Sequence, residues 1–92
     1  MPCECGYDEQ RVPATRDEIL AAAGLRNRLG DLLETVVIDP SGRWMSVMRC
    51  TRCGRYWAED CLESGMATLL FVYPIETDDP AGWIASAESV WA

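Results

Sequence analysis

Four of the five cysteines in this 92-residue chain form two short clusters, and each cluster ends in glycine. The clusters are CECG at residues 3–6 and CTRCG at residues 50–54. Zinc prefers thiolates at the corners of a tetrahedron, and tight turns supply such thiolates in closely spaced pairs. Backbone amides of a CxxCG turn can point at the sulfurs, while glycine adopts the positive φ that closes the turn. The sequence therefore predicts one zinc site with these ligands: Cys3, Cys5, Cys50 and Cys53.

Other uses of the cysteines stay open. A redox dithiol would need Cys50 as an exposed thiol of low pKa at a helix N-terminus, and disulfides or unligated core thiols are further alternatives. Iron is an alternative to zinc. Cys61 stands apart, and we expect it to be a small buried hydrophobe or a substitute ligand.

The cysteine turns resemble those of the zinc-ribbon or zinc-knuckle family of small domains. Cys50, Cys53 and Gly54 match the family pattern, and Cys3 and Cys5 match it less closely because they form CxC rather than CxxC. The resemblance implies a metal clamped between two turns on β-hairpins, with a structural role. A long intervening segment with a predicted helix departs from the ribbon topology.

The N-terminal half predicts an arm, a helix and a hairpin. Residues 1–13 form an irregular arm tethered by the metal site. Thr15-Arg16-Asp17-Glu18 is a capping box, which predicts a helix over about 16–34 or two short helices that meet near Gly24. Strands at 34–38 and 43–49, joined by a turn at 39–42, form a hairpin that leads into Cys50.

The C-terminal half adds two strands and a helix. Residues 56–62 and 67–75 have the pattern of strands, and the second is apolar on both faces. Asp79 followed by Pro80 predicts a helix start, with an apolar stripe that extends to Val90 and Trp91. The fold class is therefore α+β: one domain over 1–92 with an antiparallel sheet of about four strands and a helix before and after it.

The chain is acidic, with 15 aspartates and glutamates against 8 basic residues and a net charge of −7. Such a surface repels nucleic-acid and membrane phosphates and suits a basic protein partner, although it also serves solubility alone. The chain weakly resembles small acidic immunity-type proteins of bacteria, which implies a toxin-neutralising partner interaction. The candidate contact residues are Glu59, Asp60, Glu63, Glu76, Asp78 and Asp79.

Enzyme chemistry is disfavoured by what the sequence lacks. There is no histidine, and a zinc site closed by four thiolates leaves no position for a reactive water. The carboxylates of Glu59 and Asp60 are adjacent on a predicted strand and so point apart. We therefore expect a non-enzymatic module.

A nucleic-acid-binding ribbon is the first alternative, because Arg49, Arg52 and Arg55 surround the second knuckle next to two aromatic residues. A thiol redox protein is the second. Trp44 and Trp57 flank the knuckle and are expected to cover the metal site, whereas an exposed tryptophan would mark an interaction hot spot.

No basic start with a following apolar run indicates a signal peptide. The longest apolar stretch, residues 66–75, is too short to cross a bilayer. We expect a cytoplasmic location without membrane association.

Overall fold

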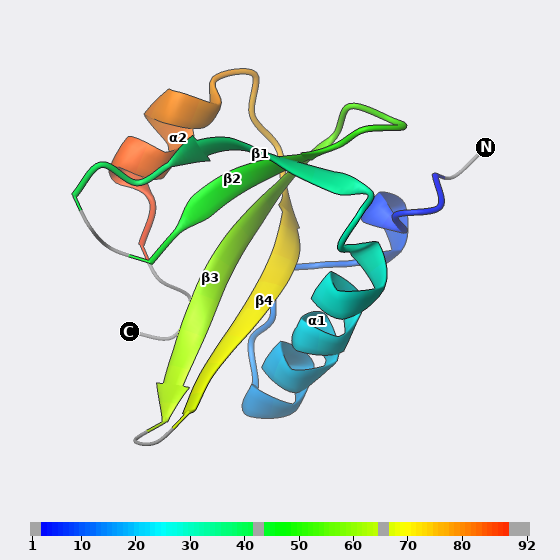
Figure 1. Cartoon of the computed structure of the whole chain (residues 1–92), viewed down its shortest axis with the longest axis vertical. Coiled ribbons are helices and arrows are strands. Elements are labelled where there is room, and N and C mark those ends of the chain that lie inside the picture. The colour runs from blue at the N-terminus through cyan, green and yellow to red at the C-terminus, as the bar shows by residue number, and fades with distance from the viewer. Residues whose placement is uncertain (1–2, 42–43, 65–66, 89–92) are drawn as a thin grey trace.

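The structure is a computed structural model that describes residues 3–41, 44–64 and 67–88. A four-stranded antiparallel sheet with strand order β1-β2-β3-β4 is flanked by α1 beside β4 and by α2 near β1 and β2 (Figure 1). The predicted α+β class is confirmed. The elements are η1 (Tyr7–Glu9), α1 (Arg16–Leu29), β1 (Leu33–Ile38), β2 (Ser46–Cys50), β3 (Tyr56–Ser64), β4 (Ala67–Ile75) and α2 (Pro80–Ser86).

α1 begins at the predicted capping box. The hydroxyl of Thr15 accepts a hydrogen bond from the backbone N–H of Glu18 at 3.2 Å. The Glu18 carboxylate accepts from the N–H of Ala14 at 3.5 Å, one residue earlier than the reciprocal bond of an ideal capping box. The local sequence therefore fixes the start of the helix.

The end of α1 differs from the prediction. The helix is continuous through Gly24, which is exposed, and it stops at Leu29 rather than near residue 34. The N–H of Leu32 then donates to the carbonyl of Leu29 at 2.8 Å, which closes a tight turn into β1. Leu33 and Glu34, at the end of the predicted helix, thus belong to β1, whose later residues are β-branched and favour a strand.

The β1–β2 hairpin has a longer connection than predicted. The N–H of Asp39 donates to the carbonyl of Met45 at 3.0 Å, and β2 begins only at Ser46. The Asp39 carboxylate accepts from the N–H of Ser41 at 2.9 Å, as in an Asx turn. The predicted turn over 39–42 lies partly outside the described residues. β2 still ends at Cys50, so the hairpin leads into the second knuckle.

α2 starts as predicted. The Asp79 carboxylate accepts from the N–H of Gly82 at 3.2 Å, and Pro80 is the first helical residue. Ile84 of this helix is buried against the sheet. The helix ends at Ser86, and the predicted continuation of its apolar stripe at Val90 and Trp91 lies outside the described residues.

The sheet register divides the core into two faces. Glu59 pairs with Val72 and Trp57 with Pro74, so these side chains share one face, while those of Ala58 and Tyr73 share the other. One buried cluster joins α2 and the first half of α1 to the second face, and another joins the end of α1 and the arm to the first. The cluster on the first face contains Cys5, Leu25, Leu29, Leu33, Cys50, Trp57 and Val72.

No helix among the described residues is long and apolar enough to cross a membrane.

Candidate metal centre

The second knuckle is a tight turn at the end of β2. The N–H of Gly54 donates to the carbonyl of Cys50 at 2.9 Å, and Gly54 has a φ of 76°. The N–H of Arg52 points at the Cys50 sulfur, with a separation of 3.4 Å. The amide-to-sulfur geometry and the glycine conformation expected for a CxxCG turn are therefore both present.

The first knuckle repeats this design in the arm. The N–H of Gly6 donates to the carbonyl of Cys3 at 3.0 Å, and Gly6 has a φ of 72°. η1 follows directly and gives the arm one regular turn. Each cluster thus ends in a left-handed glycine, as the sequence predicts.

Tyr7 fastens the arm to the sheet, a role that the cysteine pattern does not predict. Its hydroxyl donates to the carbonyl of Ile75 at 2.6 Å, and its ring meets the edge of Trp57 at 5.8 Å between centroids. The guanidinium of Arg55 lies 4.8 Å from the centre of the Tyr7 ring. The position of Tyr7 directly after a predicted metal-binding turn was the one sequence clue to this role.

The two knuckles bring the four predicted thiols together. The Sγ atoms of Cys3, Cys5, Cys50 and Cys53 all lie within 4.8 Å of one another. Cys3 is 3.6 Å from Cys50, and Cys5 is 3.7 Å from Cys53. Four sulfurs about 2.3 Å from one zinc ion form a tetrahedron with edges of about 3.8 Å. These four thiols could therefore hold a metal ion.

Burial is uneven across the group. Cys5 and Cys50 are buried, Cys3 is half-buried and Cys53 is exposed. Cys61 is half-buried on β3 and does not belong to the group. A metal held here would lie close to the surface, with the two buried thiols joining it to the core.

The thiols differ in how easily they ionise. Burial raises the pKa of the Cys5 thiol to about 12. Burial also acts on Cys50, but backbone N–H groups of Cys53 and Arg52 outweigh it and lower the pKa of Cys50 to about 7. Burial raises the pKa of Cys53. Four adjacent thiolates need a cation to offset their mutual repulsion, and a bound metal supplies it.

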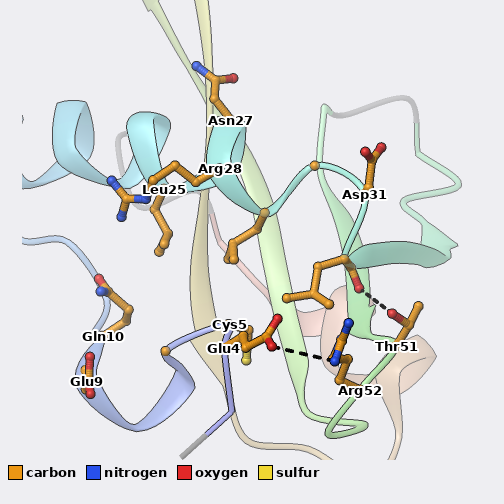
Figure 2. A pocket seen from close by; sticks show the side chains of 14 residues that line it. Glu4, Cys5, Glu9, Gln10, Leu25, Asn27, Arg28, Asp31, Thr51 and Arg52 are labelled. Atoms are coloured by element: carbon orange, nitrogen blue, oxygen red, sulfur yellow. Dashed lines mark hydrogen bonds and ion pairs between the residues drawn. The ribbon is translucent and has the colours of Figure 1, made fainter.

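A cavity of about 730 Å³ lies beside Cys5, between the arm, the end of α1 and the second knuckle. Figure 2 shows Arg52 directed at Glu4, a contact of 3.6 Å, and Leu25 pointing down from α1. The hydroxyl of Thr51 donates to the carbonyl of Leu32 at 2.9 Å. These contacts fasten the knuckle to the arm and to the α1–β1 turn.

The three arginines around the second knuckle have partners within the chain. Arg49 donates to Glu34 at 2.8 Å, and Arg52 is within 3.6 Å of Glu4. Arg55 stacks on Tyr7. A phosphate would therefore compete with an intramolecular contact at each arginine.

The predicted partner-contact residues whose side chains the structure describes differ in exposure. Glu59 is half-buried and accepts from Arg26 at 2.6 Å and from Ser46 at 3.4 Å. Asp60 is only 2 % exposed and accepts from the N–H of Cys61 at 2.7 Å. Asp60 is thus unsuited to contact a partner, because strand alternation turns it into the core beside the neighbouring Glu59.

The remaining acidic candidates lie near the start of α2. Glu76, Asp78 and Asp79 are exposed, and Asp79 also caps the helix. The side chain of Glu63 lies outside the described part of the structure. An acidic surface around α2 is therefore available, without Asp60.

The two tryptophans expected at the metal site lie in different places. Trp57 is fully buried in the cluster that contains Cys5 and Cys50, and so it packs beside the thiols as expected. Trp44 is 60 % exposed and lies at the opposite end of the hairpin, where it lines a second cavity. The expectation that Trp44 covers the metal site is wrong, because Trp44 precedes β2 and the whole length of that strand separates it from the knuckle at Cys50.

Comparison with protein-family models, with curated proteins and with solved structures finds no match for this chain.

Proposed function

We propose that this chain is a non-enzymatic, zinc-stabilised module that binds a protein partner. The observation that carries the zinc assignment is the spacing of the four sulfurs, with pairs at 3.6 and 3.7 Å. Those spacings fit the sulfur tetrahedron around zinc. Iron accepts a similar set of thiolates, so the ion has to be identified by measurement.

A structural rather than catalytic role follows from the donor set. Cys3, Cys5, Cys50 and Cys53 would fill every position of a four-coordinate ion, which leaves none for water or substrate. The ion would supply positive charge and a crosslink between the arm and the hairpin. General acid–base chemistry would lack histidine, the side chain that most often provides it.

The partner we propose is a basic protein, in the manner of an immunity-type inhibitor that covers the active site of a toxin. The support is the net charge of −7, the exposed carboxylates at Glu76 and Asp78, and the exposed Trp44. Charge of one sign steers association with a partner of the opposite sign. Affinity capture at low salt should recover one basic protein whose binding weakens with added salt.

The two alternatives have less support. A nucleic-acid interface would use Arg49, Arg52 and Arg55, each of which already contacts its own chain. A redox dithiol would use Cys50, which is fully buried at the end of a strand rather than exposed at a helix N-terminus. A salt-dependent gel shift would favour the first, and reduction of insulin by the metal-free chain would favour the second.

Native mass spectrometry with and without chelator tests the zinc assignment. We expect one zinc ion per chain, lost on chelation and absent from Cys53→Ser. Cys61→Ser is the matched control, because Cys61 is outside the thiol group, and it should retain the ion. Two disulfides without metal in the untreated protein would overturn the proposal.

A further inference from the structure

The end of the sheet opposite the cysteines carries a small open cavity. Ile38 pairs with Ser46, and Ser46 pairs with Glu59, so these three side chains form a row across β1, β2 and β3. Together with Trp44 and Asp39 they line a cavity of about 310 Å³. This volume is at the lower limit for a small-molecule site and suits a single long side chain.

The strand beside this cavity is an edge strand, with a register shift between Thr35 and Val37 and with α2 nearby. β1 is the outer strand of the sheet, and no strand in the described part of the chain pairs with its other side. Five large hydrophobic side chains are exposed in the described residues, and Val36, Ile38 and Trp44 are three of them. Exposed apolar side chains next to unpaired backbone groups are the features by which an edge strand accepts an added strand.

The chemistry of the cavity selects a cation. Glu59 and Asp39 are among its lining residues, and Trp44 offers an exposed indole. The Glu59 carboxylate also accepts from Arg26 and the Asp39 carboxylate from the N–H of Ser41, so an entering cation would share these carboxylates with groups of the chain. A guanidinium or ammonium over the face of tryptophan is stabilised by the ring quadrupole and by nearby carboxylates. A neutral or acidic side chain would gain neither interaction.

We propose that an extended, basic segment of a partner protein adds as a strand to the edge of β1 and inserts an arginine or lysine beside Trp44. This inference rests on the proposed function and gives its partner-binding surface a location. A second copy of the chain is a poorer occupant, because each copy carries −7 and like charges oppose association.

The test uses the full zinc-loaded chain and short blocked peptides of alternating valine and arginine, followed by amide NMR shifts and calorimetry. We expect shifts confined to β1, Trp44 and Ser46. A peptide with glutamate in place of arginine should not bind. N-methylation of alternate peptide amides should abolish binding, since strand addition needs backbone donors.

Trp44→Ala should weaken binding of the arginine peptide by about tenfold or more, as for an interaction hot spot. Leu20→Ala is the control, because Leu20 is 49 % exposed on α1, away from the cavity, and it should bind normally. Equal binding by Trp44→Ala or by the glutamate peptide would overturn the inference.

Two further outcomes also reject the inference, and they separate it from the proposed function. NMR shifts at Glu76 and Asp78 instead of β1 would still support a basic partner, but they would place its binding surface near α2. Dimerisation in sedimentation, abolished by Trp44→Ala, would make the occupant of β1 a second copy. Binding of no basic peptide anywhere on the chain would count against both proposals.

Discussion

The two ends of one sheet face carry a tryptophan each, and their surroundings are opposite. At the cysteine end, Trp57 is fully buried among Cys5, Cys50 and the end of α1. At the hairpin end, Trp44 is 60 % exposed beside the edge strand β1. The arm and α1 cover the first end and do not bury the second. The buried end suits a role in stability, whereas recognition at the hairpin end is our proposal, and substitutions can test that division.

The largest effect should come from the thiols. Cys50→Ser removes a buried thiol of the proposed zinc site, and structural zinc contributes about 10–16 kcal/mol of binding free energy in small zinc domains. We expect loss of the near-UV circular dichroism signal and of cooperative unfolding, as with chelator. Trp44→Ala should leave both unchanged. A folded Cys50→Ser protein with native spectra would contradict a metal-dependent cysteine end.

The next largest effect on the free energy of unfolding should come from a tryptophan substitution. Trp57→Ala in the zinc-loaded protein leaves a large cavity in a packed cluster, so we expect a loss of about 3–5 kcal/mol in urea unfolding. Trp44→Ala removes a mostly exposed side chain and should cost less than about 0.5 kcal/mol. Similar losses for the two variants would erase the distinction between the ends.

The sequence was more informative about the cysteine end than about the hairpin end. Glycine placement and spacing within each cysteine pair are local features, so the left-handed Gly54 could be predicted. The joining of the two distant pairs could be predicted because a tetrahedral ion needs four thiolates. The exposure of Trp44 depends on the length of a hairpin connection and on which elements cover it. These are tertiary properties, and local pattern does not encode them.

The acidic residues illustrate the same limit. Strand alternation indicated that Glu59 and Asp60 point apart, but the sequence did not say which side the core would occupy. Tyr7 was missed because a tyrosine in an irregular arm has no periodic pattern to identify it. Its partner, the carbonyl of Ile75, is distant in sequence and becomes apparent only in the folded chain.

A smaller effect on the free energy of unfolding should come from loosening the arm at Tyr7. Tyr7→Phe removes the hydroxyl that donates to Ile75 and keeps the ring against Trp57. The part-buried carbonyl loses its partner, so we expect a cost of about 1–2 kcal/mol in urea unfolding. Hydrogen exchange in residues 3–9 should also accelerate, because the arm opens more often.

Tyr56→Phe is the matched control for the same chemical change on β3. We expect exchange in the arm to remain at the unmodified rate in that variant. Unchanged exchange in Tyr7→Phe as well would mean that the thiols alone hold the arm, and Tyr7 would then contribute nothing to covering the cysteine end.

The smallest effect on the free energy of unfolding should come from a glycine substitution, which tests backbone conformation separately from side-chain packing. Gly54 has a φ of 76°, and a Cβ placed there meets nothing within 4 Å, so Gly54→Ala adds strain without a steric clash. A left-handed non-glycine residue costs about 1 kcal/mol. Gly24→Ala, in the middle of α1 with equal space, should instead stabilise by up to about 1 kcal/mol through helix propensity. Opposite signs for the two alanines in urea unfolding would show that the knuckle needs glycine for its conformation. A stabilising Gly54→Ala would mean that the turn relaxes freely, and that packing and thiol ligation alone hold the cysteine end together.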